Sequence, residues 1–256
     1  MAEALLGARG IVKRFGGLAA LENIDIAVGR GEIFGLIGPN GAGKTTLFNV
    51  LTGVYRPDGG TISFMGHAIG GVKPHRIAEL GIARTFQNIR LFANMTALEN
   101  VMVGRHARTR TTVIGAVLRT RHAREEEADT VRRARDMLEY CGIGKRANEL
   151  AHELPYGDQR RLEIARALAT EPQLLALDEP AAGMNPTETQ TLKVLLERIR
   201  HDGVTLFLIE HDVKLVMGLC DRVAVLDYGK KIAEGAPAEV QRNPAVVEAY
   251  LGGSLA

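Results

Sequence analysis

The segment of residues 38–45 constrains the possible fold of this chain more than any other part of its sequence. It is written GPNGAGKT and matches the phosphate-binding loop (P-loop) pattern GxxxxGK[ST] at every fixed position. The apolar run at 33–37 predicts a buried parallel strand before it, and residues 45–51 predict a helix after it. Strand, glycine-rich loop and helix in that order are the context that this motif requires. The segment therefore predicts an α/β fold that binds phosphate groups.

The residue types of this segment suit a bound nucleoside triphosphate. Glycines let backbone N–H groups converge on phosphate oxygens, and the helix N-terminus adds a partial positive charge. Lys44 can then reach the β- and γ-phosphates, and the Thr45 hydroxyl can bind Mg²⁺. A glycine-rich turn without function is the alternative, which the complete motif in its proper context disfavours. The predicted ATP-binding residues of the segment are Gly38, Pro39, Asn40, Gly41, Ala42, Gly43, Lys44, Thr45 and Thr46.

Two acidic residues, Asp178 and Glu179, follow the apolar run at 174–177. A P-loop site needs such an acid at the end of a neighbouring strand, so we expect Asp178 to hold Mg²⁺ through water. We expect Glu179 to orient or deprotonate the attacking water. Alternatively, Asp178 caps the following segment, as Asp often does at such ends. The presence of the P-loop favours the catalytic interpretation.

The composition is that of an ordinary globular protein, with 46% hydrophobic and 24% charged residues among 256. The two cysteines, Cys141 and Cys220, lack a CxxC spacing, so we expect them to be buried in a protein of a reducing compartment. The sequence has no uninterrupted apolar stretch of membrane-spanning length and no secretory signal pattern, so we expect a soluble, cytoplasmic chain. A net charge of +2 does not demand a nucleic-acid partner.

Apolar runs and helical patterns alternate along most of the chain, as in α/β architecture. We predict a P-loop NTPase core with a mixed or parallel sheet, and an N-terminal antiparallel sheet of short strands in 10–28 and 60–65. A helical subdomain is predicted at about 96–169, so that 1–95 and 170–256 form the core of a single domain. Further core strands are predicted at 174–177, 205–209 and 223–226, and a turn at 228–231 leads into a last strand.

Five further features follow one another in the order of a known family. Phe15 lies upstream of the P-loop, Gln87 follows a strand-like segment, and residues 154–159 precede a helix. The segment 181–186 comes after the acid pair, and His211 ends the next strand. This order resembles that of the ATP-binding subunits of ABC transporters over nearly the whole chain. The resemblance implies that two subunits pair head to tail, so that one subunit's P-loop and the other's signature loop grip each ATP.

The resemblance also implies individual roles. Phe15 would stack on adenine, with an ordinary strand aromatic as the alternative. Gln87 would contact Mg²⁺ and water and sense the membrane subunits, and His211 would respond to the γ-phosphate. Catalysis is assigned to Lys44, Gln87, Glu179 and His211, and Mg²⁺ binding to Thr45, Gln87 and Asp178.

The signature segment departs from the family pattern LSGGQ. The resemblance implies contact with the partner subunit's ATP for Leu154, Pro155, Tyr156, Gly157, Asp158 and Gln159. Pro155 replaces the serine whose hydroxyl would touch the γ-phosphate, and Asp158 brings a carboxylate where the pattern has a neutral amide. Gly157 and the following helix N-terminus can still donate to phosphate. We therefore expect a weaker contribution to the partner's ATP, an asymmetry natural in a heterodimer.

Tyr156 and three other segments resemble the ATPases of bacterial branched-chain amino-acid importers. They are KRFGGL at 13–18, PAAGMNPTET at 180–189 and AYLG at 249–252, and the insertion at 105–127 resembles the larger of that system's two ATPases. This kinship implies ATP and Mg²⁺, a second ATPase subunit (a heterodimer, with a homodimer as the alternative) and two membrane permeases. It further implies a periplasmic amino-acid-binding protein as an indirect partner, a place at the cytoplasmic face of the inner membrane, and no nucleic-acid partner.

The insertion at 105–127 carries a local excess of arginine followed by three glutamates. One interpretation places these arginines near acidic lipid headgroups or a permease loop. We favour a solvated helix face with Glu–Arg pairs, because the pattern at 119–140 is helical and charged. Its predicted apolar stripe is Val131, Ala134, Met137 and Leu138, and the arginines are Arg105, Arg108, Arg110, Arg119, Arg121 and Arg124.

Two other functions stay open at this point. A soluble ABC-type ATPase could act on nucleic acid or ribosomes, although one cassette and a helix too short for a coiled-coil arm argue against it. A regulatory module could hold ATP without hydrolysing it, although intact Glu179 and His211 argue against that. Salt-dependent nucleic-acid binding would identify the first. A Glu179→Gln variant that traps ATP while the wild type hydrolyses it would exclude the second.

Overall fold

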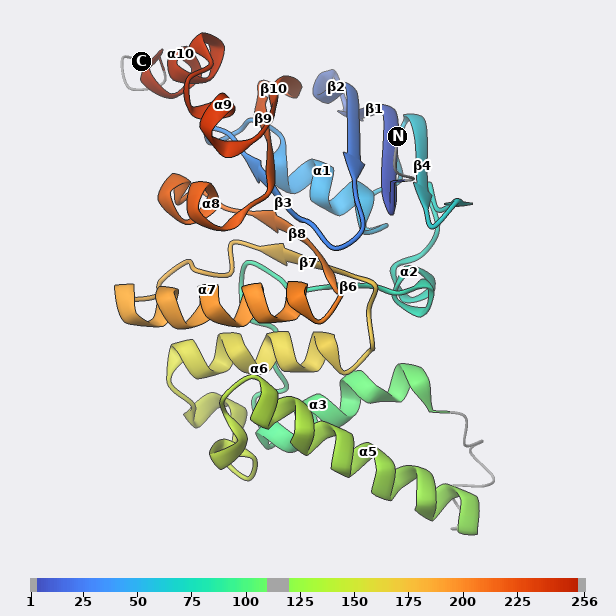
Figure 1. The fold of residues 1–256 in the computed structure, drawn as a ribbon. Coiled ribbons are helices and arrows are strands. Elements are labelled where there is room, and N and C mark those ends of the chain that lie inside the picture. The colour runs from blue at the N-terminus through green and yellow to red at the C-terminus, as the bar shows by residue number, and fades with distance from the viewer. Residues whose placement is uncertain (1–3, 110–119, 253–256) are drawn as a thin grey trace.

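Two β-sheets and several layers of helices make up the part of the chain described by the computed structural model, residues 4–109 and 120–252 (Figure 1). The larger sheet has the described strand order β10-β9-β3-β8-β7-β6. All of its neighbouring strands pair in parallel except β10, which pairs antiparallel with β9, so the predicted mixed sheet is confirmed. Its strands are β3 (Ile33–Ile37), β6 (Ile82–Arg84), β7 (Leu174–Asp178), β8 (Thr205–Ile209), β9 (Arg222–Asp227) and β10 (Lys230–Gly235).

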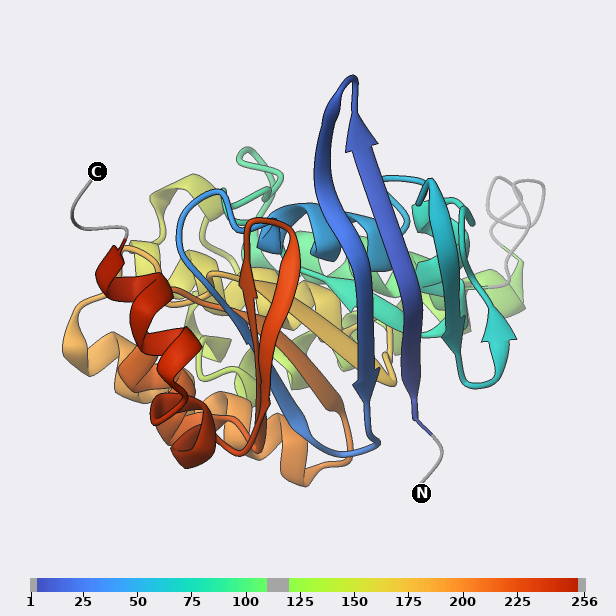
Figure 2. The same cartoon turned by 90° about the horizontal axis from the view of Figure 1, so that it is seen from above.

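The smaller sheet is antiparallel, as predicted, with the order β2-β1-β4-β5. The prediction of short strands is wrong for its first two members, which are 10 and 11 residues long. Residue 10, where the first strand region was predicted to begin, lies inside β1; Gly10 has φ 61 and sits at a register shift where the strand bends. The turn between these two strands projects beyond the rest of the sheet (Figure 2). The strands are β1 (Leu6–Phe15), β2 (Leu18–Val28), β4 (Gly59–Phe64) and β5 (His67–Ala68).

Side chains of the larger sheet alternate between two apolar cores. On β8, Phe207 faces the core shared with the smaller sheet, whereas Leu206 and Leu208 face the core shared with the outer helices. In the first core, Phe207 stacks on Phe34 of β3 and on Phe48, with ring centroids 5.9 and 6.1 Å apart. Burial on both faces explains why these strands are continuous apolar runs in the sequence.

Helices lie on both faces of the larger sheet (Figure 1). The helix α1 (Lys44–Leu51) packs between the two sheets, and α7 (Pro186–His201) and α8 (Val213–Leu219) cover the opposite face. Within residues 4–109 and 120–252, none of the helices is long and apolar enough to cross a membrane. The remaining helices of the core are α2 (Pro74–Leu80), α9 (Pro237–Gln241) and α10 (Pro244–Gly252).

The described part of 96–169 is helical, as predicted, apart from an isolated bridge between Thr96 and Leu150. The predicted apolar stripe of its longest helix is confirmed at three of four positions, because Ala134 and Leu138 are buried and Met137 packs against the same core. Val131 is half-buried. Its elements are α3 (Ala97–Arg105), α5 (Arg121–Tyr140) and α6 (Tyr156–Leu168), with single 3₁₀ turns at His106–Arg108, Gly144–Arg146 and Ala151–Glu153.

Both cysteines are buried and free, as expected from the sequence. Burial raises the pKa of Cys141 and of Cys220 to about 12, so both thiols stay protonated at neutral pH. Each therefore acts as a small apolar core residue.

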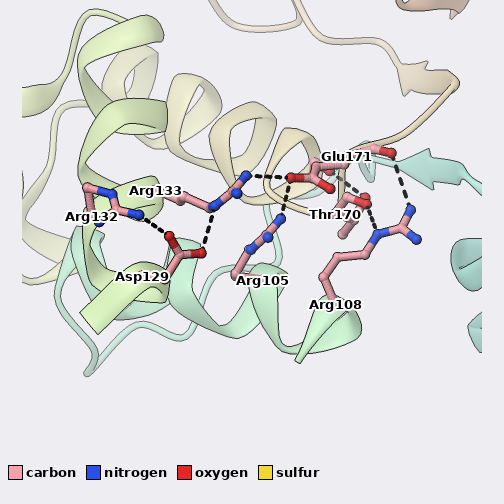
Figure 3. Close-up of polar contacts among 8 residues, drawn as sticks. Arg105, Arg108, Asp129, Arg132, Arg133, Thr170 and Glu171 are labelled. Atoms are coloured by element: carbon pink, nitrogen blue, oxygen red, sulfur yellow. Dashed lines mark hydrogen bonds and ion pairs between the residues drawn. The ribbon is translucent and has the colours of Figure 1, made fainter. Parts of the chain in front are cut away.

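Two arginines of the 105–127 insertion, Arg105 and Arg108, bind a loop that is distant in the sequence (Figure 3). Arg105 of α3 and Arg133 of α5 both donate to the Glu171 carboxylate, at 2.5 and 3.0 Å. Arg108 donates to the main-chain carbonyls of Thr170 and Glu171, at 2.7 and 3.2 Å. These contacts join α3 and α5 to the loop after α6, which the sequence pattern did not predict.

The predicted pairing along the helix is present between Arg121 and Glu125, which form an i,i+4 ion pair at 2.8 Å. Both side chains are well exposed, so the pair adds only a few tenths of a kcal/mol. Arg110 and Arg119 lie outside the described residues.

The stacked aromatic rings generate a stability prediction. Phe207→Ala should lower the free energy of unfolding by about 3–5 kcal/mol, because it leaves a cavity between β3 and α1. Phe207→Leu, which keeps most of the volume, should cost clearly less. Urea denaturation followed by circular dichroism measures both, and equal losses for the two variants would contradict the packing argument.

Candidate active site

The P-loop connects β3 to α1 and packs against main-chain atoms on two sides. A Cβ atom at Gly38 would lie 2.1 Å from the Leu226 carbonyl oxygen of β9. A Cβ atom at Gly43 would lie 2.8 Å from the Ala20 carbonyl oxygen of β2, and Gly43 has φ 99. Only glycine fits at these two fixed positions of the motif, so the surrounding fold requires them as well as the ligand.

Lys44 is the first residue of α1 and is only 8% exposed. Its ammonium donates to the Gly38 and Pro39 carbonyl oxygens, at 2.7 and 2.9 Å. Burial lowers the pKa of Lys44, while the carboxylates of Glu179 and Asp178 oppose this shift. The loop's own carbonyls thus hold the ammonium at the place where phosphate oxygens would replace them.

A cleft of about 600 Å³ opens beside the P-loop. Phe15, at the end of β1, lines this cleft with its ring 45% exposed. The ring meets Tyr55 edge-on at 5.4 Å between centroids, and the Lys13 ammonium lies 5.4 Å from the Phe15 centroid. The cleft is lined by Phe15, Leu18, Ala19, Ala20, Asn40, Gly41, Ala42, Gly43, Lys44, Thr45, Thr46, Gln87, Glu179, Tyr228 and Gly229.

Asp178 ends β7 and is 3% exposed. Burial is the main cause that raises the pKa of Asp178 to about 6; the charge of Glu179 adds to it and that of Arg84 opposes it. Within the described residues its Oδ1 atom has no hydrogen-bond partner. A buried carboxylate oxygen in this state is costly unless a cation or a proton joins it.

A second, larger cavity of about 850 Å³ is lined by Asp178, Thr45 and Gln87 together. These three side chains offer a carboxylate, a hydroxyl and an amide oxygen, which are the hard donors that Mg²⁺ prefers. With the unpartnered Asp178 oxygen, this donor set fits a magnesium ion.

Glu179 is held in a left-handed conformation with φ 47, and its N–H donates to the Ile209 carbonyl at 2.9 Å. The Gln87 amide Nε2 donates to Glu179 Oε2 at 2.9 Å. The Nδ1 atom of His211 lies 3.7 Å from the same oxygen. Three residues predicted to be catalytic therefore meet at one carboxylate, although they come from separate segments. The positive φ of a non-glycine residue here is typical of a functional site.

Glu210 belongs to the same region, although the sequence analysis did not single it out. Its carboxylate is fully buried and accepts the Ala181 and His211 N–H groups, at 2.8 and 3.2 Å. Burial raises the pKa of Glu210. The residue joins the segment after Glu179 to His211, and its only sequence signal is a carboxylate between an apolar strand and a histidine.

Arg84, at the end of β6, links α1 to the Gln87 segment and was also missed. It donates to the side chains of Asn49 and Thr52 on α1, at 3.0 and 2.7 Å. Its guanidinium lies 4.6 Å from the ring centroids of both Phe48 and Phe86. Asn49 and Thr52 lie 35 and 32 residues from Arg84 in the sequence, so no local pattern could have revealed these two contacts.

The signature segment lies at the start of α6, away from the P-loop of its own chain. Of the described residues 154–159, none lines the cleft beside the P-loop. The Asp158 carboxylate forms ion pairs with Arg161 and, at 3.3 Å, with Arg146. Gln159 donates to the Leu154 carbonyl at 2.8 Å. The structure thus does not bring the signature residues together with Lys44 and Glu179.

Arg160 of α6 connects the signature segment to Gln87. It is 2% exposed and donates to the main-chain carbonyls of Phe86, at 2.7 Å, and of Gln87. It also donates to the Tyr156 hydroxyl at 3.1 Å. A shift of α6 would therefore be transmitted to the segment that positions Gln87.

Comparison with known families finds two matches. The sequence profile described as "ABC transporter" matches residues 21–182. A second profile, described as "Branched-chain amino acid ATP-binding cassette transporter", matches residues 230–256.

Curated relatives and solved structures agree with these matches. The chain is 47% identical to the "High-affinity branched-chain amino acid transport ATP-binding protein LivG" of Salmonella typhimurium, over 98% of this chain and 99% of the relative. It is 46% identical to the BraF protein of the same description from Pseudomonas aeruginosa, with the same coverage. A crystal structure of a nucleotide-free ATP-binding cassette from an ABC transporter superposes with a TM-score of 0.85 at 33% identity, covering 96% of this chain and 98% of that one.

The buried Asp178 carboxyl generates a pH-dependent stability prediction. Its pKa of about 6 lies above the ordinary 3.8, so the folded protein binds the extra proton and stability falls as pH rises from about 4 to 6. In buffer without nucleotide or magnesium, Asp178→Asn should therefore raise the free energy of unfolding at pH 8 by up to about 3 kcal/mol.

The gain should become small near pH 4, where the carboxyl is protonated in the folded state and already partly protonated in the unfolded state. Urea denaturation at both pH values measures it. The exposed Asp136 on α5 provides the control, because Asp136→Asn should change stability little at either pH. A gain for Asp178→Asn that is the same at pH 4 and pH 8 would refute the role of burial.

Proposed function

This chain belongs to the ATP-binding subunits of ABC transporters, and from that membership we propose that it energises a bacterial importer of branched-chain amino acids. As a member of the family it is an ATP-hydrolysing P-loop enzyme that works with Mg²⁺. Its near full-length likeness to the LivG and BraF proteins carries the cargo assignment, and the carboxyl-terminal profile match supports it.

The roles of the catalytic residues follow from the contacts around Glu179. Lys44 would exchange its carbonyl partners for the β- and γ-phosphates of ATP. Glu179 would accept a proton from the attacking water, with Gln87 and His211 fixing the orientation of its carboxylate. His211 would respond to the γ-phosphate, and Phe15 would stack on adenine.

Thr45, Gln87 and Asp178 would hold the magnesium ion. When bound, Mg²⁺ supplies positive charge beside the phosphate oxygens. The Asp178 carboxylate would then lose its proton and gain the partner that its buried oxygen lacks among the described residues.

Coupling to membrane subunits is proposed to run through Gln87. Gln87 and Thr45 line both the cleft beside the P-loop and the larger cavity. The larger cavity carries Arg84, Arg90 and Arg166 on its wall. We propose that a segment of one of the two permeases docks in this cavity. A movement of that segment would then reach the Glu179 carboxylate through Gln87.

A second ATPase subunit is proposed to complete the site, because the signature residues do not line the cleft of their own chain. Arg146 and Arg161 neutralise Asp158, so Gly157 and the helix N-terminus are the groups left to meet the partner's phosphate. Pro155 cannot supply the usual serine hydroxyl. A heterodimer, in which the second ATPase supplies a complete signature, therefore suits this chain better than a homodimer.

We further propose that two permeases hold the chain at the cytoplasmic face of the inner membrane and that a periplasmic amino-acid-binding protein delivers the cargo. No nucleic-acid partner is proposed. The division into a core of 1–95 and 170–256 and a helical subdomain at 96–169 stays a prediction.

Glu179→Gln should retain ATP binding and lower the rate of ATP hydrolysis about 100-fold or more, because an amide cannot accept the proton. Phosphate release by the assembled transporter measures the rate, and bound nucleotide is quantified after gel filtration. Glu197→Gln on the exposed face of α7 is the matched control and should keep the wild-type rate. Wild-type protein that binds ATP without hydrolysing it would favour the regulatory-module alternative.

Affinity purification from detergent-solubilised membranes tests the partners. We expect the tagged chain to recover a second ATPase and two multi-span permeases, identified by mass spectrometry. Recovery of ribosomal proteins or nucleic acid, with a salt-dependent affinity, would contradict the importer and favour the soluble ATPase instead.

A further inference from the structure

The turn between β9 and β10 places an unusual residue beside the nucleotide cleft. It consists of Tyr228 and Gly229, both at positive φ, 41 and 76. Two-residue hairpin turns of this kind favour Asn-Gly or Gly-Gly, because a side chain with a Cβ is strained in the first position. A tyrosine in that position works against the local backbone preference.

The P-loop fixes the position of this turn. The Gly229 N–H donates to the Ala42 carbonyl of the P-loop at 3.0 Å, and the Glu22 N–H of β2 donates to the Gly229 carbonyl at 2.8 Å. A Cβ atom at Gly229 would lie 2.7 Å from the Ala20 carbonyl oxygen. The turn is therefore packed between β2 and the P-loop. The backbone of Tyr228 cannot shift without disturbing the contacts that Gly229 makes with these two segments.

The Tyr228 side chain extends into open space at this place. It is 84% exposed, compared with 45% for Phe15, and both line the cleft beside the P-loop. Within the described residues, Tyr228 has no hydrogen bond, ion pair or ring contact. The β9–β10 and β1–β2 hairpins that carry these two aromatic residues lie side by side, joined by an ion pair of Lys230 with Glu22 at 3.4 Å (Figure 2).

A second two-residue turn of the chain has the same backbone strain as the Tyr228 turn but lies elsewhere. Met65 and Gly66, between β4 and β5, also have positive φ, 50 and 78, and Met65 is 39% exposed. Met65 does not line the cleft. Strain alone is thus not the signal at Tyr228; the signal is an exposed, unpartnered aromatic ring on a turn fixed to the P-loop.

We propose that Tyr228 is a second contact residue for the nucleoside part of the bound nucleotide, packing its ring against the base or ribose in the cleft lined by Phe15. The proposal rests on nucleotide binding at the P-loop and adds to it a residue that no motif indicates. Aromatic rings bind bases through their faces, and a ring held on a rigid turn loses little conformational freedom on binding. The contact would strengthen ADP and ATP binding alike, because neither the base nor the ribose changes during hydrolysis.

The test compares nucleotide with phosphate alone on the purified full-length chain. Isothermal titration calorimetry with Mg-ADP should show a dissociation constant about 5- to 20-fold higher for Tyr228→Ala than for wild type. Tyr228→Phe should stay within about twofold of wild type, because the ring is kept. The affinity for inorganic tripolyphosphate, which lacks base and ribose, should be the same in all three proteins.

Two further variants complete the design. Tyr228→Gly removes the ring and the strained Cβ together, so it should weaken ADP as Tyr228→Ala does while the melting temperature stays at or above the wild-type value. Met65→Ala is the matched control at the other strained turn and should leave ADP affinity unchanged.

The outcomes separate this inference from the proposed function. Equal weakening of ADP and tripolyphosphate by Tyr228→Ala would mean that the variant disturbs the P-loop, and would overturn the nucleoside contact. Wild-type ADP affinity in Tyr228→Ala, with weakened affinity in Phe15→Ala, would leave the nucleotide site intact and remove Tyr228 from it. Wild-type protein that binds neither ADP nor tripolyphosphate would refute nucleotide binding itself.

Discussion

Close packing of main chain against main chain around the phosphate-binding loop is the constraint on which the rest of the site depends. Gly38 lies against a carbonyl of β9 and Gly43 against a carbonyl of β2, at distances that leave no room for a Cβ atom. On a third side of the loop, the Gly229 N–H donates a hydrogen bond to the Ala42 carbonyl. A loop held by backbone atoms keeps its N–H groups in a fixed arrangement, which is the preorganisation that phosphate binding requires. Strands of both sheets pack against the loop, so the smaller sheet helps to position the phosphate-binding residues as well as bury the core.

Around this loop the fold buries several carboxyl groups and gives each a different environment. The Glu210 carboxylate accepts hydrogen bonds from the Ala181 and His211 N–H groups and so holds these two segments together. Glu179 remains partly accessible and is oriented by Gln87 and His211. Asp178 has a buried oxygen, Oδ1, without a hydrogen-bond partner among the described residues, and its pKa is raised to about 6. Environment rather than residue type thus separates a structural acid, a candidate base and a candidate metal ligand.

The arrangement of the cavities explains why such a chain needs partners. The cleft beside the P-loop lacks the signature residues of its own chain, and the larger cavity meets it at Thr45 and Gln87. Arg160 adds a mechanical link, because it joins α6 and Tyr156 to the main chain at Gln87. A signal from either a second ATPase or a permease would converge on the same glutamine, and from there on the carboxylate of Glu179. We therefore propose Gln87 as the point at which hydrolysis and transport influence each other.

The sequence by itself determined the features that arise within a few residues of one another. The strand, the glycine loop and Lys44 are contiguous, and Asp178 follows its apolar strand directly, so local pattern was enough to predict the P-loop core and the sheet that carries it. The resemblance of the motif order to that of ABC transporter ATPases added Gln87 and His211. Only the tertiary structure showed the roles of Glu210 and Arg84, the turn of Tyr228 against the P-loop, and the binding of Arg105 and Arg108 to the loop at Glu171. It also showed that the strand region predicted to begin at residue 10 starts earlier, in one long strand that bends at Gly10. These contacts join segments tens of residues or more apart, or, as at Gly10, depend on a neighbouring strand. Their geometry is set by how the two sheets and the helices pack, which no local residue pattern encodes.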